Sequence, residues 1–364
     1  MPLTKTHVYV STSGAGEIAC FELTDSGQLT TRGAVAAGSL VMPMAATRDG
    51  RWLHAAVRSQ PYQLCSFAVQ PDSGALTQQP AVPLVDNMVY IALDHTERWL
   101  VCASYSGNTV AVHPVQPDGQ ASPTPTCFFD TGGIKPHAIA IAPDNRFVYV
   151  PHLGSDELQI YPFDETMGRL DAAAVRSIRL PDNFGPRHLR FSPNGRFLYL
   201  LGEMSGLVAV FDYHADTGAL TLTQTVSSLP ADTPLRPGIP RVPSGVQETT
   251  PVDVSTLIWC ADLLITPDGR YLYSTERTRD HISCLSIDPT NGHLRYLHQT
   301  STERQPRGIA CDAQGHYLIS SGEHADQLSL FRIDASSGAL QRVQRIPIGA
   351  GANWIQVVSA ISPG

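Results

Sequence analysis

The chain has 364 residues, of which 42% are hydrophobic, and a formal net charge of −8. This length suits either one large fold or two ordinary domains. Because binding a phosphate backbone requires an excess of basic charge, 25 Lys and Arg against 33 Asp and Glu argue against a nucleic-acid partner. No window approaches 18 unbroken apolar residues, which excludes a transmembrane helix and a membrane partner.

The N-terminal segment and the cysteines indicate the cellular compartment. Residues 1–10, MPLTKTHVYV, begin a strand-like alternation and lack the apolar core of a secretory signal. The seven cysteines are scattered without a CxxC pair, which argues against a disulfide framework or a structural zinc site. We therefore expect a cytoplasmic protein.

One phrase recurs along the whole chain. Its copies read AATRDGRWLHA, IALDHTERWLVC, IAIAPDNRFVYV, LRFSPNGRFLYL, LLITPDGRYLYS and IACDAQGHYLIS. The residue before the aromatic one falls at Arg51, Arg98, Arg146, Arg196, Arg270 and His316, with spacings of 47, 48, 50, 74 and 46. A period of about 48 residues indicates a repeat architecture.

Each repeat contains four strand-like segments. An alternating segment leads through a Pro-Asp-Gly-type turn into a second, a third such as LQIYPF follows, and a D-x-x-x-G-x-L turn enters the fourth. Four strands per repeat are typical of a β-propeller blade. The N-terminus lacks a first strand and the C-terminus supplies one, ANWIQVV. The sequence thus predicts an all-β, seven-bladed β-propeller with four antiparallel strands per blade, its ring closed by N- and C-terminal strands in one blade.

We expect one domain, residues 1–364; the alternative is two unrelated β-domains that share turn chemistry. The spacing of 74 places an insertion at about 229–255, which is rich in Pro, Ser and Thr. Such composition predicts an irregular loop between two blades.

Charged residues concentrate at two positions of the repeat, just before the first strand and just after the second. In a propeller both positions open on the same end of the central channel. They hold four arginines, one histidine and two glutamates: Arg58, Arg187, Arg277, Arg307, His137, Glu203 and Glu323. This predicts a channel mouth that binds a small anionic molecule. Structural roles are the alternative, since arginines can brace neighbouring blades, His137 can cap a turn and Glu203 can pair with an inter-blade arginine.

Other motifs are weak. The chain has no GxSxG elbow, no P-loop, no HExxH and no carboxylate cluster with the ligand count of a cation site, so we expect neither metal nor cofactor. Tyr149, Tyr199 and Tyr273 recur at one strand position, which favours packing between blades.

Four segments carry a family resemblance: KPHAIAIAPDNRFVYVP, FGPRHLRFSPNGRFLY, WCADLLITPDGRYLYSTERT and ERQPRGIACDAQGHYL. The sequence resembles the bacterial 6-phosphogluconolactonases of the seven-bladed propeller type, from HVYVST to NWIQVV apart from the insertion. Their superfamily also includes the fungal 3-carboxy-cis,cis-muconate lactonizing enzyme. The resemblance implies a lactonase of carbohydrate metabolism, in the pentose phosphate pathway, with catalytic residues at His137, Glu203, Arg187 and Arg277.

We interpret the chain as a carboxylic-ester hydrolase that opens a sugar δ-lactone, 6-phosphogluconolactone above all, with water activated by Glu203 or His137. The substrate contacts assigned to the mouth are Arg58, Lys135, His188 and Arg307. A lactonase or cycloisomerase for a carboxylated lactone, such as an aldarate lactone or a carboxymuconolactone, is one alternative. A non-enzymatic scaffold for protein partners is the other.

Overall fold

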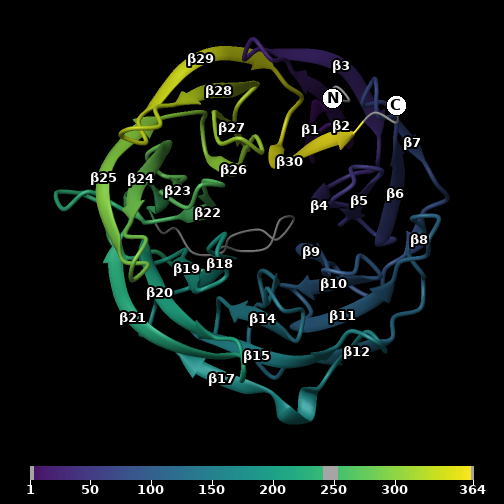
Figure 1. Ribbon diagram of the computed structural model, residues 1–364, viewed down its shortest axis with the longest axis horizontal. Coiled ribbons are helices and arrows are strands. Elements are labelled where there is room, and N and C mark those ends of the chain that lie inside the picture. The colour runs from purple at the N-terminus through teal and green to yellow at the C-terminus, as the bar shows by residue number, and fades with distance from the viewer. Residues whose placement is uncertain (1–3, 241–252, 362–364) are drawn as a thin grey trace.

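The computed structural model describes residues 4–240 and 253–361. These residues form seven antiparallel sheets, which stand around a central channel like the blades of a wheel (Figure 1). The predicted seven-bladed β-propeller is confirmed. We number the blades along the chain, beginning with the one that contains both ends.

The first strand of each blade lies next to the channel and the last lies at the rim (Figure 1). Blade 1 consists of β30 (Ala352–Ile361), β1 (Thr4–Thr12), β2 (Glu17–Leu23) and β3 (Leu29–Ala36). Blade 2 consists of β4 (Val41–Ala46), β5 (Trp52–Val57), β6 (Gln63–Val69), β7 (Leu76–Gln78) and β8 (Val82–Pro83). Blade 3 consists of β9 (Tyr90–Leu93), β10 (Trp99–Ser104), β11 (Thr109–Pro114) and β12 (Cys127–Asp130).

The remaining four blades follow the same order. Blade 4 contains β13 (Ala140–Ile141), β14 (Phe147–His152), β15 (Glu157–Asp164), β16 (Arg169–Leu170) and β17 (Arg176–Arg179). Blade 5 contains β18 (Pro186–Phe191), β19 (Phe197–Gly202), β20 (Leu207–His214) and β21 (Ala219–Ser227). Blade 6 contains β22 (Cys260–Ile265), β23 (Tyr271–Glu276), β24 (His281–Ile287) and β25 (Leu294–Ser301). Blade 7 contains β26 (Pro306–Cys311), β27 (Tyr317–Gly322), β28 (Gln327–Ile333) and β29 (Leu340–Pro347).

The two ends of the chain close the ring, as predicted. β30 pairs antiparallel with β1, from Thr4 opposite Ile361 to Thr12 opposite Ala352. The sheet order is β3-β2-β1-β30, so the C-terminal strand takes the inner position that the N-terminal segment leaves open. The first and last strands therefore lie in one blade (Figure 1).

The rim strand departs from the prediction in two blades, because it is broken into two short pieces. In blade 2, β7 and β8 both pair with β6, and Pro80 lies between them; proline has no N–H to continue the ladder. In blade 4, β16 and β17 both pair with β15 and are separated by the 3₁₀ turn η1 (Ala172–Ala174).

A repeated tyrosine joins neighbouring blades. Tyr149 on β14 donates a hydrogen bond to the carbonyl of Gly218 in the next blade, at 2.7 Å. Tyr9, Tyr199 and Tyr273 make the same bond to Gly74, Gly292 and Gly338. Gly218 has a φ of +67°, and a Cβ there would lie 2.5 Å from the Phe147 ring, so this turn requires glycine. The inter-blade packing role predicted for Tyr149, Tyr199 and Tyr273 is confirmed, and Tyr9 has the same role.

The predicted insertion lies between β21 and β22, and its residues 241–252 fall outside the described part of the chain. Leu229 and Leu235 on the N-terminal side are buried against blades 5 and 6. On the C-terminal side, the 3₁₀ turn η2 (Val254–Thr256) precedes a hydrogen bond of 2.8 Å from the N–H of Ile258 to the carbonyl of Arg236. Within the described ranges, no helix has the length and apolar character needed to span a membrane.

Deletion of residues 352–364 tests the ring closure. The loss of β30 exposes an unpaired edge of β1 and removes the buried side chains Ala352, Ile355 and Val358. We expect the midpoint of thermal unfolding to fall by at least about 10 °C, or the protein to aggregate. A peptide of residues 352–364 added in trans should restore part of the loss by strand addition. An unchanged melting curve would contradict the closure.

Candidate active site

Irregular strand pairing directs polar side chains to one end of the channel. The register of β18 against β19 shifts between Pro186 and Leu189, around Arg187 and His188. Similar shifts occur at the start of β4, β22 and β26. A bulge re-aims the side chains at its position, and here it falls where each inner strand enters the channel.

Three charged side chains form a buried cluster at this end. The Glu203 carboxylate, just after β19, lies 2.7 Å from Nε of Arg187 and 3.0 Å from Nη2 of Arg277. The three side chains are only 2–3% exposed. Glu203 therefore joins a guanidinium of its own blade to one of blade 6.

Backbone carbonyls at the start of β22 hold the two guanidinium groups. Arg187 donates from Nη1 to the carbonyl of Ala261. Arg277 donates to the carbonyls of Trp259 and Cys260, both at 3.1 Å. Burial lowers the pKa of Arg187, and the charge of Glu203 opposes this effect. The bracing and ion-pairing roles that the sequence left open are thus present in the structure.

His137 lies beside this cluster, just before β13. It is 5% exposed, and its ring centre is 5.5 Å from that of Tyr105 and 5.4 Å from that of His188. Burial, with the charge of Arg187 adding to it, holds the pKa of His137 well below the ordinary histidine value. Its imidazole is therefore neutral at neutral pH.

His188 is bound to a carboxylate for which the sequence reasoning had found no role. Nδ1 of His188 lies 2.8 Å from Oδ1 of Asp262 on the inner strand β22. Burial and Arg187 lower the pKa of His188 to about 3, against the effect of Asp262. Burial raises the pKa of Asp262, but the His188 bond and nearby cations outweigh it and bring the value to about 2. The available signal was an acidic residue in the apolar segment WCADLLI.

The other predicted substrate contacts lie around the same opening. Nζ of Lys135 lies 5.3 Å from the centre of the Tyr105 ring, and burial lowers its pKa. Arg58 donates from Nε to the amide oxygen of Asn87 at 2.8 Å. Arg307 pairs with Glu323. Arg58, Arg307, Glu323, Asn87 and Asn353 are among the residues that line a small recess here.

All eight predicted site residues thus lie at one end of the channel. Among the residues that the sequence predicted at the mouth, five are cations, Arg58, Lys135, Arg187, Arg277 and Arg307, and two are carboxylates, Glu203 and Glu323. In a chain with a net charge of −8, this local excess creates a potential that attracts anions. Among the described residues, no group of three or more His, Cys, Asp or Glu side chains is placed to hold a metal ion.

The buried cluster predicts that two equally buried glutamates, Glu203 and Glu303, contribute differently to the free energy of unfolding. Glu203→Gln leaves two buried guanidinium groups without a counter-charge and should lower the free energy of unfolding by about 3–5 kcal/mol. Glu303, also 3% exposed, pairs with Arg345, which is 52% exposed, so Glu303→Gln should cost at most about 1–2 kcal/mol. Urea unfolding of both variants measures the difference, and equal losses would contradict the cluster's role.

Known proteins share the whole fold. The 6-phosphogluconolactonase of Serratia proteamaculans is 32% identical over 352 residues, covering 97% of this chain and 98% of that protein. The 6-phosphogluconolactonase of Klebsiella pneumoniae is 31% identical over 353 residues, with 97% and 99% covered. The solved structure of PpgL, the periplasmic gluconolactonase of Pseudomonas aeruginosa, superposes with a TM-score of 0.81 at 26% identity, covering 98% of this chain and 99% of that one.

A family model described as "Lactonase, 7-bladed beta-propeller" matches residues 7–357, which is nearly the entire chain. The match includes every blade and every residue of the mouth. The chain therefore belongs to the seven-bladed β-propeller lactonase family.

Proposed function

We propose that the protein hydrolyses a sugar δ-lactone and that its substrate is 6-phospho-D-glucono-1,5-lactone. Family membership makes it a carboxylic-ester hydrolase rather than a scaffold. The observation that supports an anionic substrate is the cationic mouth around the neutral imidazole of His137. A cytoplasmic location remains a prediction, and the structural relative PpgL is periplasmic.

His137 is the better candidate for the general base. A general base must be unprotonated, and the lowered pKa of His137 keeps its imidazole neutral. The Glu203 carboxylate is engaged in ion pairs with Arg187 and Arg277. Its role in this proposal is to hold the two guanidinium groups in place.

The arginines stabilise negative charge. When water attacks the lactone carbonyl, an oxyanion develops, and the N–H groups of Arg187 and Arg277 that remain beyond their internal bonds can donate to it. Arg58, Arg307 and Lys135 bind the phosphate, where guanidinium geometry favours bidentate contacts. Each step of this reaction uses only side chains of the chain itself.

A substrate panel tests the activity. Purified protein is assayed with 6-phosphogluconolactone, glucono-1,5-lactone and carboxylated lactones, with spontaneous opening subtracted. We expect the highest kcat/KM for the phosphorylated lactone. A higher value for a carboxylated lactone would move the protein to the alternative substrate class, and no activity on any lactone would refute the proposal.

His137→Asn should lower kcat by about 10²–10⁴-fold, because the imidazole that accepts the proton is lost. Glu203→Gln should act mainly through stability, so its folded fraction should keep more activity than His137→Asn. Circular dichroism of each variant checks that the propeller is intact. If Glu203→Gln alone abolished turnover in a folded protein, the base assignment would pass to Glu203.

Substitution of the outer cations should separate charged from uncharged substrates. Arg58→Gln and Arg307→Gln should raise KM for the phosphorylated lactone by about 10–100-fold and leave KM for gluconolactone nearly unchanged. Arg51→Gln is the matched control, since Arg51 is 71% exposed and lies in the turn between β4 and β5, away from the mouth. Equal effects on both lactones would show that these cations do not bind the phosphate.

A further inference from the structure

Two neighbouring imidazole rings at the mouth carry buried nitrogens without a hydrogen-bond partner. These atoms are Nδ1 of His137 and Nε2 of His188. The ring centres lie 5.4 Å apart at an interplanar angle of 63°. The structure has no hydrogen bond between these two nitrogens. At this separation of the ring centres, a turn of the His137 ring that points Nδ1 at Nε2 of His188 brings the two atoms to hydrogen-bond distance. A buried polar group without a partner is costly, and here two are adjacent.

Asp262 determines which of these nitrogens is a donor. Its carboxylate accepts hydrogen bonds from the backbone N–H of Leu263 at 2.8 Å and of Ile309 at 3.2 Å. The ionised group must also accept the bond from His188, so Nδ1 of His188 carries the hydrogen. In a neutral imidazole the other nitrogen then bears the lone pair. Nε2 of His188 is therefore an acceptor that lacks a donor.

We propose that Asp262, His188 and His137 form a hydrogen-bonded relay during the reaction, in which the His137 ring turns so that its Nδ1–H donates to Nε2 of His188 and its Nε2 faces the reacting water. In this relay His137 is the catalytic residue, and His188 and Asp262 are positioning residues. The inference rests on the proposed lactone hydrolysis. Asp262 fixes the tautomer of His188, and this tautomer in turn leaves Nε2 of His137 as the atom that accepts the proton.

The proton and electron balance is complete with water and the lactone. Nε2 of His137 accepts a proton from water while the water oxygen forms a bond to the carbonyl carbon. The imidazolium is stabilised by its Nδ1–H bond to His188, whose own Nδ1–H points to the Asp262 anion. When the ring C–O bond breaks, Nε2 of His137 returns the proton to the leaving alkoxide oxygen. The relay itself ends unchanged.

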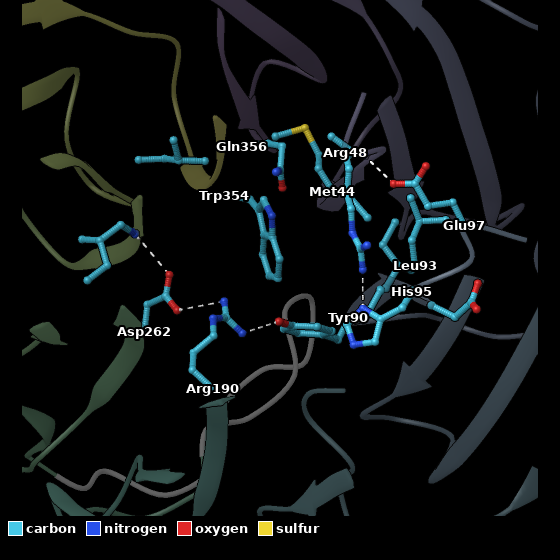
Figure 2. Close-up of a pocket in the computed structure, with 17 residues that line it drawn as sticks. Met44, Arg48, Tyr90, Leu93, His95, Glu97, Arg190, Asp262, Trp354 and Gln356 are labelled. Atoms are coloured by element: carbon cyan, nitrogen blue, oxygen red, sulfur yellow. Dashed lines mark hydrogen bonds and ion pairs between the residues drawn. The ribbon is translucent and has the colours of Figure 1, made fainter. Parts of the chain in front are cut away.

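Packing in the channel holds the middle ring of the relay. The His188 ring centre lies 5.4 Å from that of Tyr90 and 6.1 Å from that of Trp354, both edge-on. The Tyr90 hydroxyl in turn accepts a hydrogen bond of 2.7 Å from Nη1 of Arg190, and Nη2 of Arg190 lies 4.0 Å from Oδ1 of Asp262 (Figure 2). These groups enclose His188 and, together with its bond to Asp262, restrict the rotation of its ring.

A cavity of about 330 Å³ lies on the far side of these groups, and Asp262, Arg190, Tyr90 and Trp354 line it (Figure 2). It extends toward the opposite end of the channel, where Arg48 and Glu97 belong to turns between first and second strands. Asp262 thus lies at the boundary between the mouth and the interior of the channel. The charged groups that act on the two imidazoles are Arg187, Arg190, Arg307 and Asp262.

The tautomers provide a test that does not depend on turnover. Nitrogen-15 NMR of histidine-labelled protein distinguishes Nδ1–H from Nε2–H imidazoles, and spectra of His137→Asn and His188→Asn assign the two signals. We expect both residues to carry the hydrogen on Nδ1. An Nε2–H tautomer at either residue would overturn the relay, whatever the lactonase activity.

Kinetics then measure the contribution of the carboxylate. Asp262→Asn removes its charge and should lower kcat by about 10–100-fold with KM within about twofold of the wild type. Asp268→Asn, in the exposed turn of the same blade, is the control and should retain the wild-type kcat. Since Asp262→Asn can reduce folding, His188→Gln provides a second variant with the same expectation. An unchanged kcat in either folded variant would refute the relay; inactive wild-type protein with the expected tautomers would refute only the proposed function.

Discussion

Closure of the ring by β1 and β30 is the constraint on which the rest of the molecule depends. A blade cannot cover both its faces alone, because each sheet packs its side chains against the next one. The tyrosine-to-glycine bonds connect the second strand of one blade to the turn before the fourth strand of the next, as Tyr149 and Gly218 do. Because the two terminal strands pair in one sheet, the contacts between blades form a closed ring in the described residues.

The mouth depends on the same contacts between blades. Glu203 belongs to blade 5 and Arg277 to blade 6, so their ion pair exists only while the two blades are packed. The His188–Asp262 bond spans the same boundary. Desolvation makes these charges expensive unless they are paired, and the fixed blade geometry supplies the pairing. The same geometry keeps the imidazole of His137 neutral beside a group of cations.

Much of this arrangement could be predicted from the period of the repeat. Equivalent positions in a propeller open on the same end of the channel, so the repeat alone placed Arg58, Arg187 and Arg307 together. The tyrosine contacts followed in the same way, because their recurrence pointed to a structural role. The pairing of the terminal strands followed from a missing first strand and an extra last one.

Other features could not be predicted from the repeat, because they depend on individual residues that differ between blades. Asp262 occupies an inner strand between the two repeat positions, and the bulge at the start of β22 sets its direction. The ion pairs of Glu203 depend on the positions of Arg187 in its own blade and Arg277 in the next one, which the repeat period does not specify. The breaks in the rim strands depend on local residues such as Pro80, which do not recur from blade to blade.

The residues at the mouth differ from blade to blade, although the strands that carry them repeat. Corresponding positions before the first strands carry Met42, Val89, His137, Arg187, Ala261 and Arg307. A ring of seven identical blades would place seven copies of one side chain there, and an imidazole, a guanidinium and their carboxylate partners could not meet. The chemistry therefore requires blades that differ at the mouth while the turn glycine recurs in all of them and the tyrosine in four of them. The packing contacts that repeat between blades make the ring rigid, and the differences between blades at the mouth create a site that can orient a substrate.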